Sequence, residues 1–142
     1  MKFLALLLAY SAVSSGAARL DGELKQWKRI TLTFDGPETG EDETPNPFTD
    51  FRLDLTFKHS SGRTLVVPGF YAADGNAAES SAVKGNKWRV YFLPPLAGAW
   101  TYAASFRTGK DVAIADDPKA GSPAAFDGAT GRFDVKAALV PG

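Results

Sequence analysis

Cysteine is absent from this 142-residue chain, and the formal net charge is zero. Without cysteine the chain can form no disulfide, no thiolate metal site and no thiol nucleophile. Small exported domains often depend on disulfides, so we expect a hydrophobic core that suffices without them. The basic residues are scattered rather than gathered into a stripe. Because nucleic-acid-binding proteins concentrate lysine and arginine on one surface, a nucleic-acid partner is not expected.

Groups that could perform catalysis are also scarce. The single histidine, His59, stands beside Ser60 and Ser61 in a predicted turn, where we expect it to face solvent rather than to serve as a base. Glycoside hydrolysis needs two carboxyl groups, one of which has a raised pKa in an apolar surrounding. The carboxylates here lie in loops or at outward strand positions such as Asp54. The sequence therefore predicts a chain that is not an enzyme and has no cofactor.

The first 18 residues have the pattern of a bacterial signal peptide. Lys2 provides the positive charge, residues 3–13 are mostly apolar, and residues 14–18 are small. The apolar stretch is too short to span a bilayer, and no second one follows. We expect export, to the periplasm or the medium, with no membrane attachment after cleavage. Cleavage would leave about 125 residues, enough for one domain.

Short segments with a period of two dominate the remaining chain and indicate β-strands. The clearest segments are 27–34, 50–58, 64–70, 87–93, 99–106 and 132–135, with 112–114 as a weaker one. No segment has a sustained helical period. The pattern predicts an all-β fold, an immunoglobulin-like antiparallel β-sandwich of two sheets.

Two hairpins are expected from the turn residues between these segments. The first joins 50–58 to 64–70, and the second joins 87–93 to 99–106 through the turn at 94–98. Pro68 places the segment 64–70 at a sheet edge or a bulge, because proline cannot donate to a ladder.

Two long loops are candidates for function, and the first, 35–49, is strongly acidic. Crowded carboxylates could hold calcium, although the spacing does not match a calcium-binding loop. A solvated acidic loop is the favoured interpretation. The carboxylates of the calcium alternative are Asp35, Glu38, Glu41, Asp42 and Glu43.

The aromatic residues divide by strand alternation into core and surface. The core set is Phe51, Phe57, Trp88, Phe92, Trp100 and Tyr102. Trp27, Tyr71 and Tyr91 are left as candidates for a platform on which a sugar ring could stack. Covering a sheet face or docking another domain is the alternative for each.

The second long loop, 71–86, carries three further polar candidates. Asp74, Asn76 and Glu79 stand among alanines and glycines. Asp74 and Asn76 flank Gly75 and most simply form a turn with side-chain to backbone hydrogen bonds. Alternatively, the loop presents hydrogen-bonding groups to a saccharide or to a neighbouring domain.

Several stretches resemble the β-sandwich family DUF5060, which precedes a (β/α)8 catalytic barrel in secreted bacterial proteins related to glycoside hydrolases. The matching stretches are WKRITLTFDGP from Trp27, TPNPFTDFRLDLTF from Thr44, VVPGFYAADGNAAES from Val66, KWRVYFLPPLAGAWTYAASF from Lys87 and GRFDV from Gly131. With the signal peptide at 1–18, the resemblance divides the rest of the chain into a lead-in at 19–26, the sandwich at 27–136 and a tail or linker at 137–142.

The resemblance also implies a function. It predicts a non-catalytic accessory domain that docks on a downstream glycoside hydrolase barrel in cis and helps to shape its carbohydrate cleft. The barrel would carry the catalytic carboxylates, so no catalytic residue is expected here. A free-standing carbohydrate-binding module that contacts polysaccharide, or a cell-surface sandwich that binds protein, stays as the alternative.

Overall fold

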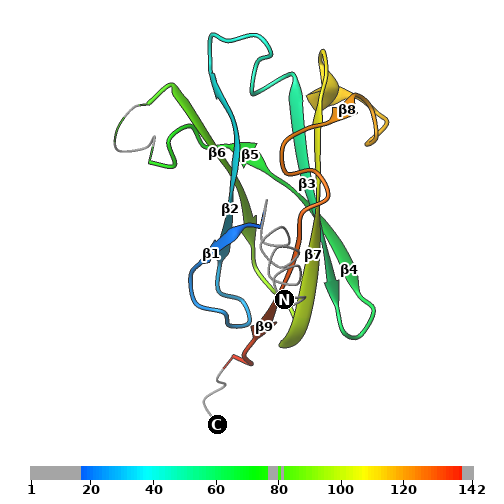
Figure 1. Cartoon of the computed structure of the whole chain (residues 1–142). Coiled ribbons are helices and arrows are strands. Elements are labelled where there is room, and N and C mark those ends of the chain that lie inside the picture. Colours follow the sequence, from blue (N-terminus) through cyan, green and yellow to red (C-terminus); the bar gives the residue numbers. More distant parts are fainter. Residues whose placement is uncertain (1–16, 77–79, 81, 139–142) are drawn as a thin grey trace, which may run out of the picture.

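Two antiparallel sheets enclose the core, in the computed structural model that describes residues 17–76, 80 and 82–138. The strands are β1 (Arg19–Asp21), β2 (Ile30–Gly40), β3 (Phe51–His59), β4 (Thr64–Pro68), β5 (Phe70–Tyr71), β6 (Lys84–Phe92), β7 (Gly98–Thr108), β8 (Ser122–Pro123) and β9 (Thr130–Val135). One sheet has the order β1-β2-β6-β5, and the other has the order β4-β3-β7-β8 with β9 also on β7 (Figure 1). The expected all-β, immunoglobulin-like sandwich is confirmed. The predicted signal peptide lies almost wholly outside the described residues.

Alternating side chains make the core between the sheets. In β3, Phe51, Leu53, Leu55 and Phe57 point inward and are buried. All six aromatic residues predicted for the core are buried. Their rings contact one another across the two sheets, as Phe57 and Phe92 do with ring centroids 3.9 Å apart. Large apolar rings at this density explain how the fold closes without a disulfide.

The first predicted hairpin is confirmed, but the second is wrong. β3 pairs with β4, and β4 is an edge strand, which accommodates Pro68. β6 and β7, however, lie in different sheets, because β6 pairs with β2 while β7 pairs with β3. Residues 94–98 therefore form an arch between the sheets. Both strands present large apolar side chains to the same core, which gives them the pattern of a hairpin without the pairing.

The loops also differ in part from expectation. β2 continues to Gly40 across a register shift between Asp35 and Thr39, so the acidic loop is shorter than predicted. The segment 112–114 is not a strand but a 3-10 turn, η1 (Val112–Ile114). β9 pairs with β7 and closes the sheet, as predicted for 132–135. β8 and β9 bind opposite ends of β7, and these define the upper and lower ends of the sandwich in Figure 1.

No helix in the described part of the chain is long and apolar enough to cross a membrane.

Candidate functional site

The predicted contact residues do not form one site but lie at separate places on the sandwich. Trp27 lies at the lower end, beside the arch between the sheets. Tyr91 lies on the outer face of the four-stranded sheet, whereas the side chain of Tyr71 is buried in the core between the two sheets. Asp74 and Asn76 belong to the loop that follows β5. Glu79 lies outside the described residues.

Trp27 is held outward by its backbone. Its φ angle is 63°, in the left-handed region that side chains other than glycine rarely adopt. Its backbone nitrogen donates to the carbonyl oxygen of Pro94 over 3.0 Å. The residue is 60% exposed, and the neighbouring Leu93 is also exposed. A backbone in an unfavourable conformation thus presents the Trp27 side chain to solvent.

The segment that follows β9 leaves the sandwich at this same lower end. The nitrogen of Gln26 donates to the carbonyl of Lys136 over 2.8 Å, and the nitrogen of Lys136 donates to Leu24 over 2.9 Å. The Gln26 amide also donates to the carbonyl of Pro95 and accepts a bond from the nitrogen of Ala138. Gln26 thus ties the departing chain to the arch, one residue from Trp27.

Tyr71 cannot serve as an open stacking platform, in contrast to the sequence-based expectation. It is only 9% exposed, because β5 turns it toward Trp88 inside the sandwich. Its hydroxyl donates to the carbonyl oxygens of Thr39 and Gly85, at 2.9 and 3.2 Å. Burial raises the pKa of this phenol above its usual value. Tyr71 therefore joins the irregular end of β2 to the start of β6.

Tyr91 is exposed, as predicted, and belongs to a small aromatic and cationic patch. The Arg29 guanidinium lies 4.3 Å from the centre of its ring, which is a cation–π contact. Phe70, half-exposed on the adjacent strand, has its ring centroid 5.0 Å from that of Tyr91. The sequence did not single out Phe70 or Arg29. Phe70 comes directly after Pro68-Gly69, where the chain changes sheets, and it lies on the exposed side while Tyr71 is buried.

The turn predicted around Gly75 is present. The carboxylate of Asp74 accepts hydrogen bonds from the nitrogen of Asn76 and the hydroxyl of Ser80, both at 2.8 Å. These bonds hold the pKa of Asp74 below its usual value. Both oxygens of the carboxylate are occupied within the loop, so its visible role is to shape the loop.

The acidic residues of the first long loop do not converge. Asp35 pairs with Lys87 across the ladder, and Glu43 lies 3.7 Å from Lys84. In the residues described by the structure, no three acidic or histidine side chains gather closely enough to hold a metal ion. The acidic side chains of this loop are therefore not arranged as a calcium site.

His59 is buried, so the prediction that it faces solvent is wrong. Its Nε2 lies 2.8 Å from the carbonyl oxygen of Ala97 and must donate to it. Its Nδ1 lies 3.1 Å from the backbone nitrogen of Ser61 and 2.9 Å from the hydroxyl of the same residue. Both ring nitrogens are therefore used to join the β3–β4 turn to the arch.

A cleft of about 300 Å³, which the sequence did not predict, lies where the chain crosses from β4 to β5. Phe48, Phe70 and Tyr71 contribute aromatic surface to it, and Arg52 and Asp54 contribute charge. Gly69 makes the crossing possible, because a Cβ there would lie 2.4 Å from Cδ2 of Leu53. The sequence signal was the Arg-x-Asp spacing on the outward face of β3.

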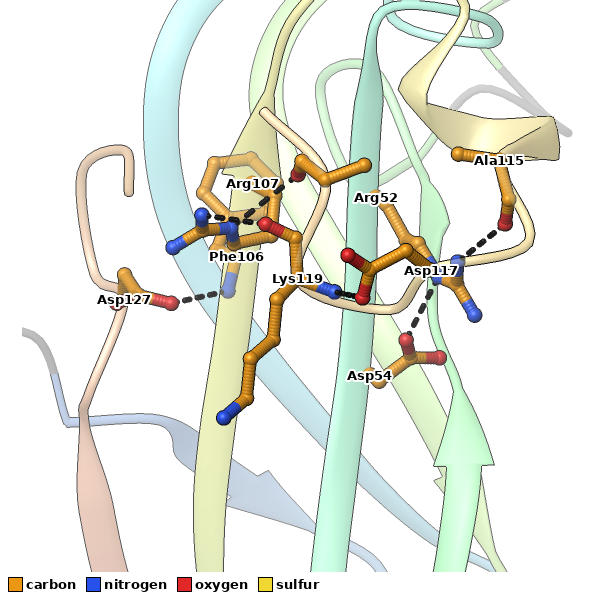
Figure 2. Close-up of polar contacts among 9 residues, drawn as sticks. Arg52, Asp54, Phe106, Arg107, Ala115, Asp117, Lys119 and Asp127 are labelled. Carbon is orange, nitrogen blue, oxygen red and sulfur yellow. Dashed lines mark hydrogen bonds and ion pairs between the residues drawn. The ribbon is translucent and has the colours of Figure 1, made fainter. Parts of the chain in front are cut away.

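Two arginines hold the loop after β7 (Figure 2), and Ala113 of that loop lines the cleft. Arg52 donates from Nε to Asp54 over 2.9 Å and from Nη1 to the carbonyl of Ala115 over 3.0 Å. Arg107 donates to the carbonyls of Lys119 and Gly121, both at 2.7 Å. At the far end of the loop, the carboxylate of Asp127 accepts a hydrogen bond from the backbone nitrogen of Phe106. A loop rich in small residues is thereby fixed on the sheet.

Comparison with known proteins agrees with this fold. A family model described as "Domain of unknown function (DUF5060)" matches residues 23–107. The chain is similar to the crystal structure of a "putative glycoside hydrolase" from Bacteroides vulgatus, with 27% identity and a TM-score of 0.55. That match covers 84% of this chain but 17% of the Bacteroides chain, so this chain spans about a sixth of that protein. The search of curated proteins found no match.

Proposed function

Because this chain belongs to the DUF5060 family, we propose that it is the non-catalytic accessory β-sandwich of an exported carbohydrate-active enzyme of the glycoside hydrolase kind. The observation that carries the proposal is the match to the Bacteroides protein, which takes up most of this chain and a small part of that one. Most of the longer chain is left for other domains, and a catalytic barrel of about 250 residues would fit there. Export, expected from the first 18 residues, would bring the enzyme to polysaccharide outside the cell.

The carboxyl groups support a non-catalytic role. A glycosidase acid must hold its proton near neutral pH, which needs a raised pKa. Among the described residues, the carboxyl groups whose pKa the fold shifts are Asp50 and Asp74, and both are shifted downward by hydrogen bonds to the charged form. We therefore assign hydrolysis to the partner domain.

Docking is proposed at the lower end of the sandwich. Ala138 is bonded to Gln26, so the last described residue lies at the end of the sandwich where Trp27 and Leu93 are exposed. Aromatic residues are over-represented at the centres of interfaces, where large rigid side chains bury apolar area at a small entropy cost. An exposed tryptophan at the point of departure is thus a natural anchor for a catalytic barrel in cis.

The test begins with the gene and then uses the parent enzyme. If the reading frame beyond codon 142 encodes a barrel, deletion of the sandwich should lower turnover of polysaccharide and leave hydrolysis of a small aryl glycoside nearly unchanged. Trp27→Ala in the full enzyme should weaken the contact between the domains, seen as faster amide exchange at that end. Ile114→Ala is the matched control, because Ile114 is 79% exposed in η1 at the opposite end. Equal effects of the two variants would contradict docking at Trp27.

A further inference from the structure

The cleft at the β4–β5 crossing combines an aromatic wall with one fixed charge pair. Phe48 is 54% exposed, and its ring meets the edge of Tyr71 at a centroid distance of 5.7 Å and an interplanar angle of 79°. Two hydrogen bonds position the loop that carries Phe48. The backbone nitrogen of Asn46 donates to the carboxylate of Asp50, and the backbone nitrogen of Phe48 donates to the side-chain oxygen of Asn46. These bonds fix the backbone around Phe48, and the contact with Tyr71 places its ring at the cleft.

The charge pair offers one donor and one acceptor side by side. The side chains of Arg52 and Asp54 are 26% and 18% exposed, and they are joined at 2.9 Å. The carbonyl of Ala115 holds the guanidinium from the other side, as Figure 2 shows. Among the described residues, Nη2 of Arg52 and Oδ1 of Asp54 have no hydrogen-bond partner. A preorganised donor beside a preorganised acceptor matches adjacent hydroxyl groups, each of which both donates and accepts.

The charges also decide which ligands fit. An anionic ligand would meet the carboxylate of Asp54, and a cationic ligand would meet the guanidinium of Arg52. A neutral polyol is repelled by neither charge. The cleft of about 300 Å³ is at the lower end of the range of small-molecule sites, so it suits one or two sugar rings rather than a folded protein.

We propose that this cleft binds a neutral pyranose unit of a polysaccharide, with the sugar against Phe48 and Phe70 and two adjacent hydroxyl groups on Arg52 and Asp54. The choice of saccharide rests on the proposed function. The binding site itself is separate from the docking end at Trp27. It would make the accessory domain a second point of contact with the substrate.

The test is a titration of the purified chain, followed by amide chemical shifts, with cellohexaose, xylohexaose and mannohexaose. At least one of these should shift resonances of β3, β5 and the loop 46–50. Hexagalacturonate, an anionic oligosaccharide, should bind at least about tenfold more weakly, because it meets Asp54. Shifts confined to other surfaces, no shift with any of the three, or equal binding of hexagalacturonate would overturn the proposal.

Variants locate the site. Phe48→Ala removes an exposed ring, and Asp54→Asn removes the charge while keeping an oxygen acceptor. We expect each to lower affinity by about tenfold, in samples whose amide spectra remain dispersed. Val66→Ala is the control, because Val66 is an exposed apolar side chain of β4 that does not line the cleft, and it should leave affinity unchanged. Loss of affinity in Val66→Ala with retention in Phe48→Ala would overturn the assignment. Deletion of the sandwich from the parent enzyme tests the accessory role independently of these titrations.

Discussion

The backbone nitrogen of Trp27 lies 3.0 Å from the carbonyl oxygen of Pro94, and this bond sets an exposed indole beside the arch that joins the two sheets. One residue earlier, Gln26 binds the segment that leaves β9. The place where the described chain ends after β9 and the place where a tryptophan is exposed to solvent are thus joined by consecutive residues. This relationship connects the fold to the proposed docking role.

Trp27 should be dispensable for the stability of the isolated chain. Its left-handed backbone costs about 1 kcal/mol in a residue with a side chain, and glycine removes that cost. Trp27→Gly is therefore expected to unfold in urea at the same free energy as the parent chain or up to about 1 kcal/mol higher. Trp27→Ala, which keeps the strain, is the comparison. A loss above about 2 kcal/mol in Trp27→Gly would mean that the indole is structural rather than a contact residue.

His59 should be a structural link between the two sheets. Replacing it by alanine leaves the carbonyl of Ala97 and the nitrogen of Ser61 without their partners, and we expect a loss of about 2–3 kcal/mol in the free energy of unfolding. His59→Gln can still donate to Ala97, so it should lose less. Equilibrium unfolding of both variants by tryptophan fluorescence is the measurement. Wild-type stability in His59→Ala would show that these two bonds do not hold the arch.

The hydroxyl of Tyr71 should matter more than that of Tyr91, although both are tyrosines of the same sheet. Tyr71→Phe leaves the carbonyls of Thr39 and Gly85 without their shared donor, at a cost of about 1–3 kcal/mol. Tyr91→Phe changes an exposed side chain and should stay within about 0.5 kcal/mol. Chemical denaturation of the two variants compares them directly, and equal effects would refute the assignment.

Asp50 should make the stability of the chain sensitive to acid. Its pKa lies below the usual 3.8, chiefly because the backbone nitrogen of Asn46, and then that of Asp111, donates to the carboxylate. A lowered pKa means that the folded chain binds this proton less tightly than the unfolded chain. The stabilisation is therefore present above about pH 3.8 and is lost as the pH falls through the folded pKa.

Removing the charge should flatten this dependence. Asp50→Asn is expected to melt at a lower temperature than the parent chain at pH 7, with the difference shrinking below pH 3.8. Melting temperatures between pH 2.5 and 7 are the measurement. Asp134→Asn, at an exposed position of β9, is the control and should keep the parent profile. A constant difference at all pH values would exclude a role for the charge of Asp50.

The alternation of β3 predicted the core, the first hairpin and the fold class, because burial on one face leaves a period-two record in the sequence. Which strands pair with one another is recorded less clearly in the sequence. β6 and β7 have the same alternation whether they share a sheet or face each other across the core, so the arch at 94–98 could not be told from a hairpin turn. Tyr71 and His59 were misplaced for a related reason, since burial of a polar ring depends on distant partners such as Thr39 and Ala97.

The cleft could not be predicted from any single segment. It needs Phe48 from one loop, Arg52 and Asp54 from β3, and Phe70 from β5. These come together because Gly69 lets the chain pass close to Leu53 at the change of sheet. The sequence displays all these residues but not the crossing that assembles them.

The central claim, that this sandwich assists a glycoside hydrolase without performing hydrolysis, is tested most directly by one activity measurement. The purified chain is incubated with a panel of reducing-end-labelled polysaccharides and oligosaccharides, and the labelled products are separated and counted. We expect no cleavage of any glycan by the chain alone and cleavage when the parent enzyme with its catalytic domain is used. Release of product by the chain alone, in proportion to its concentration, would contradict the claim.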